Sequence, residues 1–139
     1  IDKMAFGTYN SKFEKRTAFD WLSRDNFQVD KYIADEYCGF LFTTAGYRDL
    51  FSLLAFVSSK EWFEGLSKEL PVLIISGAMD PVCNYSKGID QVCNMLKAAG
   101  KTNFKKILYP DARHEILNEE ACFDTVCSDV LEFVNSVIA

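Results

Sequence analysis

The residues PVLIISGAMDPV, 71–82, carry the clearest fold signal in the chain. Their aliphatic run VLIIS, 72–76, is too short for a helix and is typical of a parallel strand covered on both faces. Gly77 follows this run, and Asp80 lies four residues beyond it. A second run, FKKILY at 104–109, is followed five residues later by His114, the only histidine of the chain. The sequence therefore predicts two strands, each leading into a loop with a titratable side chain.

Helical spacing separates and follows the two predicted strands. Between them, apolar residues recur at i, i+3, i+4 and i+7, namely Ile89, Val92, Cys93 and Leu96. We expect this helix to begin at an Asn84 cap and to end at Gly100. A last helix is expected from an Asn118 cap, with a buried stripe of Phe123, Val126, Cys127, Val130, Leu131 and Val134. The order strand, helix, strand, helix predicts an α/β fold with parallel strands.

The first part of the chain has a different character. Residues 1–63 hold fifteen of the twenty aromatic residues, in short helical patterns at 13–25, 28–40 and 47–59. Two interpretations are open: core packing under a loop-rich region, or a cap that lines an apolar binding cavity. We divide the chain into a helical, aromatic-rich cap segment, 1–58, and a βαβα core part, 59–139, whose first short helix is capped by Ser59.

The predicted topology places Asp80 and His114 at one edge of the sheet. Parallel strands direct their carboxyl ends to the same edge, where ligand and catalytic groups collect in open α/β sheets. A carboxylate that accepts the imidazole Nδ1–H fixes the tautomer and leaves the other nitrogen free as a general base. The alternative for Asp80 is a turn role before Pro81, and a lone histidine is often structural. The matching positions after consecutive strands favour an acid–base pair.

Such a pair needs a nucleophile, and the sequence offers no convincing one. The elbow pattern G-x-S-x-G is absent; the nearest stretch, GLSKE at 65–69, lacks the second glycine and leads toward a strand. Two interior-type strands also do not make an independently stable sheet. We therefore expect this chain to be part of a larger α/β protein.

Composition argues against several classes of function. The net charge is -5 and basic residues are scattered in small groups, so a nucleic-acid-binding surface is not expected. No apolar run approaches membrane-spanning length, so no integral membrane segment is expected. The five cysteines are odd in number and lack a C-x-x-C spacing, so neither a disulfide framework nor a zinc site is expected, and a reducing compartment, the cytoplasm, is favoured. With one histidine and no clustered thiols, no structural metal site is expected, and we also expect no cofactor.

The segments PVLIISGAMDPV and KILYPDARHEILNE resemble the C-terminal end of α/β-hydrolases, in particular the monoglyceride lipase, lysophospholipase and serine aminopeptidase-like group. Upstream, NSKFEKRTAFDWLSRD, DKYIADEYCGF and FTTAGYRDL resemble that group's cap-to-core region. The resemblance implies the C-terminal part of an α/β-hydrolase fold preceded by a helical cap. It also implies that Asp80 and His114 are the acid and base of a Ser-His-Asp triad whose serine lies upstream of residue 1.

The same resemblance implies hydrolysis of carboxylic esters of a lipid-like kind, such as lysophospholipids or monoacylglycerols, by a chain inactive on its own. Peptidase, haloperoxidase or acyltransferase activity is the alternative within the fold. Candidate residues of the cap or its pocket are Phe13, Phe19, Trp21 and Phe40. This chain departs from its relatives at Cys83 and at Asp111, whose carboxylate we expect to raise the pKa of His114.

A non-catalytic role is the competing hypothesis. The open strand edges expected of this chain would be completed by a second copy, as a homo-oligomer, or by the missing N-terminal half.

Overall fold

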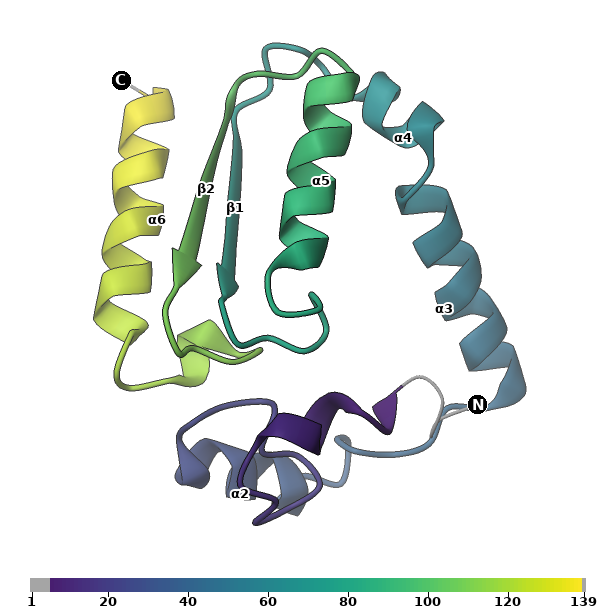
Figure 1. The fold of residues 1–139 in the computed structure, drawn as a ribbon, viewed down its shortest axis with the longest axis vertical. Coiled ribbons are helices and arrows are strands. Elements are labelled where there is room, and N and C mark those ends of the chain that lie inside the picture. The colour runs from purple at the N-terminus through teal and green to yellow at the C-terminus, as the bar shows by residue number, and fades with distance from the viewer. Residues whose placement is uncertain (1–5, 139) are drawn as a thin grey trace.

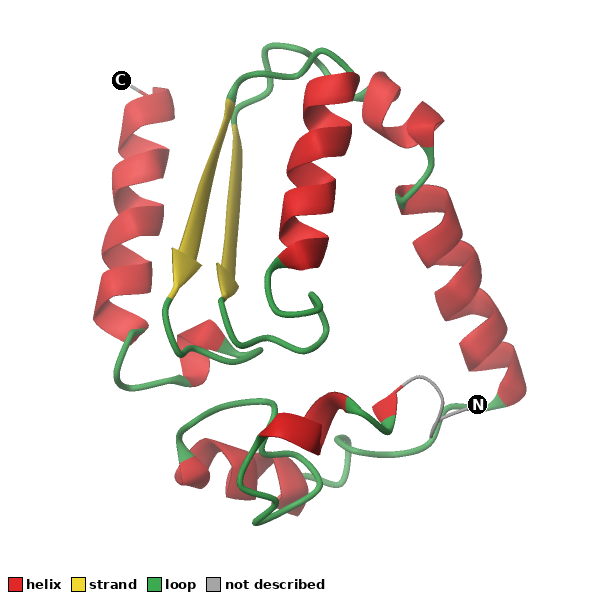
Figure 2. Ribbon diagram, in the orientation of Figure 1, coloured by secondary structure: helices red, strands yellow, loops and turns green. Residues whose placement is uncertain are grey.

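A computed structural model describes residues 6–138 of the chain (Figures 1 and 2). Two parallel strands, flanked by helices, form the centre of the structure. The elements in chain order are η1 (Tyr9–Lys12), α2 (Asn26–Ala34), α3 (Thr44–Val57), α4 (Lys60–Gly65), β1 (Val72–Gly77), α5 (Lys87–Ala98), β2 (Phe104–Tyr109), η2 (Ile116–Asn118) and α6 (Phe123–Ile138).

The sheet pairs β1 with β2 in parallel, in a register from Val72 opposite Phe104 to Gly77 opposite Tyr109. Both predicted strands are confirmed, and β1 extends one residue further than expected to include Gly77. In Figure 1, α5 and α6 lie on opposite sides of the strands, and the N-terminal segment with α2 lies beyond the strands' carboxyl ends. That segment therefore faces the sheet edge where Asp80 and His114 emerge.

The start of α5 differs from the prediction. Asn84 does not cap this helix, because Asn84, Tyr85 and Ser86 form a left-handed turn with φ values of 48°, 53° and 74°. The turn is tied to the loop after β1, where the Tyr85 amide donates to the Asp80 carbonyl at 2.9 Å. The expected end is confirmed, since Gly100 has φ 74°, a conformation that glycine adopts without a Cβ penalty. Ser59 caps α4 as expected, accepting from the Trp62 amide.

The last helix also begins later than predicted, at Phe123 rather than after Asn118. Asn118 ends the short helix η2, and the Glu119 side chain binds other loops instead of capping a helix. Only part of the predicted stripe is buried: Val126 is fully buried, while Leu131 and Val134 are 60% and 42% exposed. The core cluster around Val126 consists of Tyr109, Ala112, Ile116 and Cys122.

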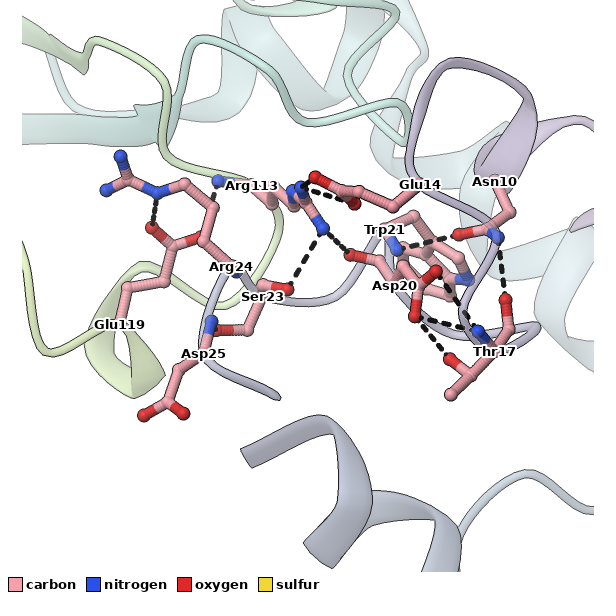
Figure 3. A network of polar contacts seen from close by, with 10 residues as sticks. All are labelled: Asn10, Glu14, Thr17, Asp20, Trp21, Ser23, Arg24, Asp25, Arg113 and Glu119. Atoms are coloured by element: carbon pink, nitrogen blue, oxygen red, sulfur yellow. Dashed lines mark hydrogen bonds and ion pairs between the residues drawn. The ribbon is translucent and has the colours of Figure 1, made fainter. Parts of the chain in front are cut away.

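The helical pattern predicted at 13–25 is wrong, whereas those at 28–40 and 47–59 overlap α2 and α3, which begin two and three residues earlier than predicted. Side-chain hydrogen bonds replace the helix. The Asp20 carboxylate accepts from the Thr17 amide at 3.1 Å, and Asn10 bonds both the Thr17 carbonyl and the Trp21 amide (Figure 3). Short polar side chains of this kind compete with helical hydrogen bonding by binding nearby backbone.

Within residues 6–138, no helix combines the length and apolarity needed to cross a membrane.

Candidate active site

The loops that follow β1 and β2 run against each other at Gly77. A Cβ atom placed on Gly77 would lie 2.1 Å from the Arg113 carbonyl oxygen and 2.2 Å from that of Ala112. Beyond this contact, the Ala78 amide donates to the Tyr109 carbonyl and the Met79 amide to the Ala112 carbonyl, each at 2.9 Å. Glycine is required here for close backbone approach, which brings the two loops into register.

This register places the side chains of Asp80 and His114 in contact. Asp80 Oδ2 lies 3.0 Å from His114 Nδ1, while Asp80 Oδ1 accepts from the Val82 amide at 2.8 Å. The turn role of Asp80 and its contact with the imidazole therefore occur together, one on each oxygen. The Asp80 side chain is 5% exposed and that of His114 is 39% exposed, so the carboxylate is buried behind an accessible ring.

The electrostatics of the pair favour the charged form of both groups. The hydrogen bond that His114 Nδ1–H donates to Asp80 raises the pKa of His114; burial opposes this rise, and the charges of Asp80 and Glu115 add to it. Burial alone would raise the pKa of Asp80, but the hydrogen bond and charge of His114, with donors at Val82 and Cys83, hold it below its usual value. A carboxylate in this state stabilises an imidazolium.

The backbone around His114 is bound to the segment that precedes α2. The His114 amide donates to the Trp21 carbonyl at 3.4 Å, and the Glu115 amide donates to the Leu22 carbonyl at 2.8 Å. The Trp21 ring lies beside the imidazole, with 5.3 Å between ring centroids. The orientation of His114 thus depends on residues more than 90 positions earlier in the chain.

An aromatic cavity of about 400 Å³ is lined in part by Trp21. Three of the four aromatic candidates from the sequence, Phe19, Trp21 and Phe40, line it. Phe13 does not; its ring packs on Arg113, with the guanidinium carbon 4.3 Å from the ring centroid. The other lining residues are Phe6, Gly7, Asn10, Ala18, Tyr32, Gly39, Leu41 and Phe42.

A buried polar network surrounds Arg113, and sequence reasoning missed it (Figure 3). Glu119, only 1% exposed, accepts hydrogen bonds from the Arg113 amide and from the amide and Nε of Arg24. The Arg113 guanidinium donates to the carbonyls of Asp20 and Ser23 and to the Glu14 carboxylate. The signal in the sequence was an arginine beside the histidine and a glutamate five residues on, with nothing to indicate their distant partners.

Asp111 and Cys83, the two positions at which this chain departs from the family pattern, do not contribute to the acid–base pair in the way that the sequence suggested for Asp111. Glu115, not Asp111, is the second acid whose charge raises the pKa of His114, because Asp111 acts on Arg24 instead. Burial and the charge of Asp80 raise the pKa of the Cys83 thiol, which disfavours the thiolate form that a nucleophile requires. Among the described residues, no group of three potential metal ligands lies together.

The fold of this chain is similar to parts of two solved structures, one described as a carboxyl esterase and the other as a lipase. A thermostable carboxyl esterase from Bacillus coagulans, solved with glycerol, aligns with 96% of this chain at 29% identity and a TM-score of 0.85. A lipase in an open form aligns with 95% of the chain at 23% identity and a TM-score of 0.83. The chain spans 44% and 43% of the lengths of these two proteins.

The search of curated proteins gave no significant match. The family model described as Hydrolase_4, serine aminopeptidase S33, matches residues 4–121, which is most of the chain. The predicted fold class is confirmed as part of an α/β-hydrolase fold. The chain belongs to the serine aminopeptidase S33 family of α/β-hydrolases.

Proposed function

We propose that this chain supplies the acid and the base of a serine hydrolase that cleaves carboxylic esters of lipid-like substrates, such as lysophospholipids or monoacylglycerols. Asp80 is the acid and His114 the base, and the nucleophilic serine is contributed from outside residues 1–139. The observation that carries the proposal is the 3.0 Å contact between Asp80 Oδ2 and His114 Nδ1 at the carboxyl edge of the sheet.

The free side of the imidazole supports a role for His114 as general base. With Nδ1 on Asp80, Nε2 is the nitrogen left for a substrate or nucleophile, and within residues 6–138 no protein group bonds it. In this mechanism Nε2 accepts the serine proton as the hydroxyl attacks the ester carbonyl, and Asp80 stabilises the resulting imidazolium. His114 then protonates the leaving alcohol, and water repeats the cycle on the acyl-enzyme.

The cavity supports an apolar acyl group as the part of the substrate that is bound. Its walls are mostly aromatic, and Trp21 belongs both to the cavity and to the surroundings of His114. The similar solved protein described as a carboxyl esterase agrees with ester chemistry.

All five cysteines are free thiols, which agrees with a reducing compartment such as the cytoplasm.

The test is ester hydrolysis by the intact protein that contains this chain, compared with His114→Ala and Asp80→Asn variants. We expect each substitution to lower kcat by at least about a thousandfold, because triad members act as a unit. A fluorophosphonate probe, read by intact mass, is expected to label a serine outside residues 1–139. Full activity in His114→Ala, or labelling of a serine within the chain, would contradict the proposal.

A second candidate is a non-catalytic association unit, and exposed apolar side chains favour it. Phe51, Leu53 and Phe56 on α3 and Leu131 and Ile138 on α6 are 47–75% exposed. Clusters of this kind mark surfaces that another copy or another segment covers. Light scattering on the 139-residue chain separates the alternatives: a dimer or larger assembly favours self-association, and a stable monomer contradicts it.

A further inference from the structure

We propose that Glu119 is a positioning residue for His114: it clamps the loop after β2 to the segment before α2 and so holds the imidazole against Asp80. This inference rests on the proposed function of the Asp80–His114 pair. Glu119 touches neither of these side chains, and its effect passes through the backbone of Arg113.

The first part of the argument is the hydrogen bonding of the Glu119 carboxylate. Oε1 accepts from the Arg113 amide at 2.8 Å and from the Arg24 amide at 3.1 Å, and Oε2 accepts from Arg24 Nε at 2.6 Å. One side chain thus joins two backbone segments that are 89 positions apart in the sequence, residues 24 and 113. Charge-assisted hydrogen bonds are the strongest kind available for such a junction.

The second part is the position of the junction next to His114. Arg113 directly precedes His114, and its guanidinium donates to the Asp20 carbonyl at 2.5 Å and to Glu14 at 2.7 Å (Figure 3). On the other side, the Glu115 amide donates to the Leu22 carbonyl. The residues on both sides of His114 are therefore bound to the same segment, and only the imidazole projects toward Asp80.

The third part of the argument is the burial of the Glu119 carboxylate. Glu119 is 1% exposed, and a glutamate is almost never buried to this degree unless it is paired. The helix that the sequence predicted to start after Asn118 does not form at Glu119, and α6 begins only at Phe123. A buried carboxylate with three donors has little freedom, so the backbone it binds is fixed.

The test compares Glu119→Gln with the starting protein, using the intact protein that contains this chain. Gln can keep Oε1 on the two backbone amides only if its amide nitrogen faces Arg24 Nε, where two donors oppose each other. We expect kcat to fall by about 10- to 100-fold while KM changes less than about twofold, because the base is displaced rather than removed.

A readout independent of activity is the pKa of His114, measured by NMR titration of its imidazole signal. This signal is assigned by its absence from the spectrum of a His114→Gln variant. The charges that face the ring are Asp80 from the loop after β1 and Glu115 from its own loop. We expect Glu119→Gln to move the pKa of His114 downward toward its ordinary value as the contact with Asp80 loosens. A purely stabilising role for Glu119 would lower Tm and leave both the pKa of His114 and kcat unchanged, which would overturn the proposal.

Two further variants complete the test. In the double variant Arg24→Gln with Glu119→Gln, the side-chain carbonyl at position 24 can accept a hydrogen bond from the side-chain amide at position 119. We therefore expect kcat and the pKa of His114 to return toward the values of the starting protein. Failure to recover would count against the mechanism. Asp49→Asn is the matched control, since Asp49 pairs with Arg48 on the surface, and we expect it to change neither quantity.

If Glu119→Gln does not fold, Arg24→Met replaces it, because the Arg24 side chain is 33% exposed and its loss leaves Oε1 of Glu119 on both backbone amides. We expect the same changes, smaller in size, and unchanged kcat and pKa in that folded variant would overturn the proposal. If His114→Ala keeps full activity, the proposed function fails, while the pKa of His114 in Glu119→Gln still decides whether Glu119 positions the ring.

Discussion

The loops at the carboxyl ends of β1 and β2 and the aromatic segment that faces them are built by different forces. The loops carry Asp80 and His114 and are held by backbone hydrogen bonds, a close contact at Gly77 and the buried carboxylate of Glu119. The aromatic cavity is walled by side chains such as Phe19 and Phe40, of which Phe40 is 62% exposed. Directional contacts fix a geometry to within a few tenths of an ångström, whereas ring packing tolerates rearrangement. The acid–base pair should therefore be sensitive to small changes, and the cavity should respond gradually.

Gly77→Ala is the substitution that we expect to disturb the loops after β1 and β2 most strongly. The new Cβ would meet the Arg113 and Ala112 carbonyl oxygens at 2.1 and 2.2 Å, and backbone must move to admit it. We expect the free energy of unfolding to fall by about 3 kcal/mol or more, with loss of ester hydrolysis. Chemical denaturation of the intact protein measures the change.

Gly65→Ala is the matched control for this variant. Gly65 ends α4, and a Cβ there would meet no atom within 4 Å. We expect it to be neutral or to stabilise the protein by up to about 1 kcal/mol, because Ala favours a helix over Gly. Equal losses at Gly65 and Gly77 would show that the contact between the loops is not the cause.

Phe40→Ala tests whether the aromatic cavity responds gradually to substitution. Removing this wall of the cavity should lower kcat/KM for nitrophenyl dodecanoate about tenfold relative to nitrophenyl butyrate, because a long acyl chain loses apolar contact. Phe56→Ala is the control: Phe56 is 63% exposed, close to the value for Phe40, but lies on α3 away from the cavity. Equal effects of the two variants on chain-length preference would remove the cavity from the proposed acyl site.

The smallest effect that we predict is electrostatic. The proposed mechanism uses neutral His114, whose pKa is raised above 6.5, so kcat/KM should rise with pH through a midpoint above that value. Glu115 contributes to the raised pKa by its charge, so Glu115→Gln should move the midpoint slightly downward. The pH profile of Glu120→Gln, a neighbouring exposed acid, is expected to match that of the starting protein. An upward shift in Glu115→Gln would refute this account.

The same groups set the pH window in which their contact stabilises the fold. The contribution of His114 is complete below its unfolded pKa of about 6.5 and is lost as pH rises through its raised folded pKa. The contribution of Asp80 is present above about 3.8 and is lost as pH falls through its lowered folded pKa. Their contact therefore stabilises the protein most between these two values.

Local patterns predicted the two strands, the end of α5 at Gly100 and the cap of α4 at Ser59. These features depend on residues adjacent in the sequence, where aliphatic runs and capping side chains act directly. Where a side chain finds a distant partner, the prediction was wrong. Asn118 and Glu119 read as a helix start, but Glu119 binds Arg24 and Arg113. The helix predicted at 13–25 was wrong for a local reason, because Thr17 and Asp20 bind each other in a turn.

The sequence by itself therefore determined the parallel strand pair and the placement of Asp80 and His114 after its two strands, because strand direction follows from chain order. Only the tertiary structure decided which side chains fix His114, and that Phe13 packs on Arg113 while Phe19, Trp21 and Phe40 line the cavity. The reason is physical: contacts between residues that are not neighbours in the sequence, up to about 90 residues apart around His114, depend on three-dimensional packing and leave no periodic pattern in the sequence.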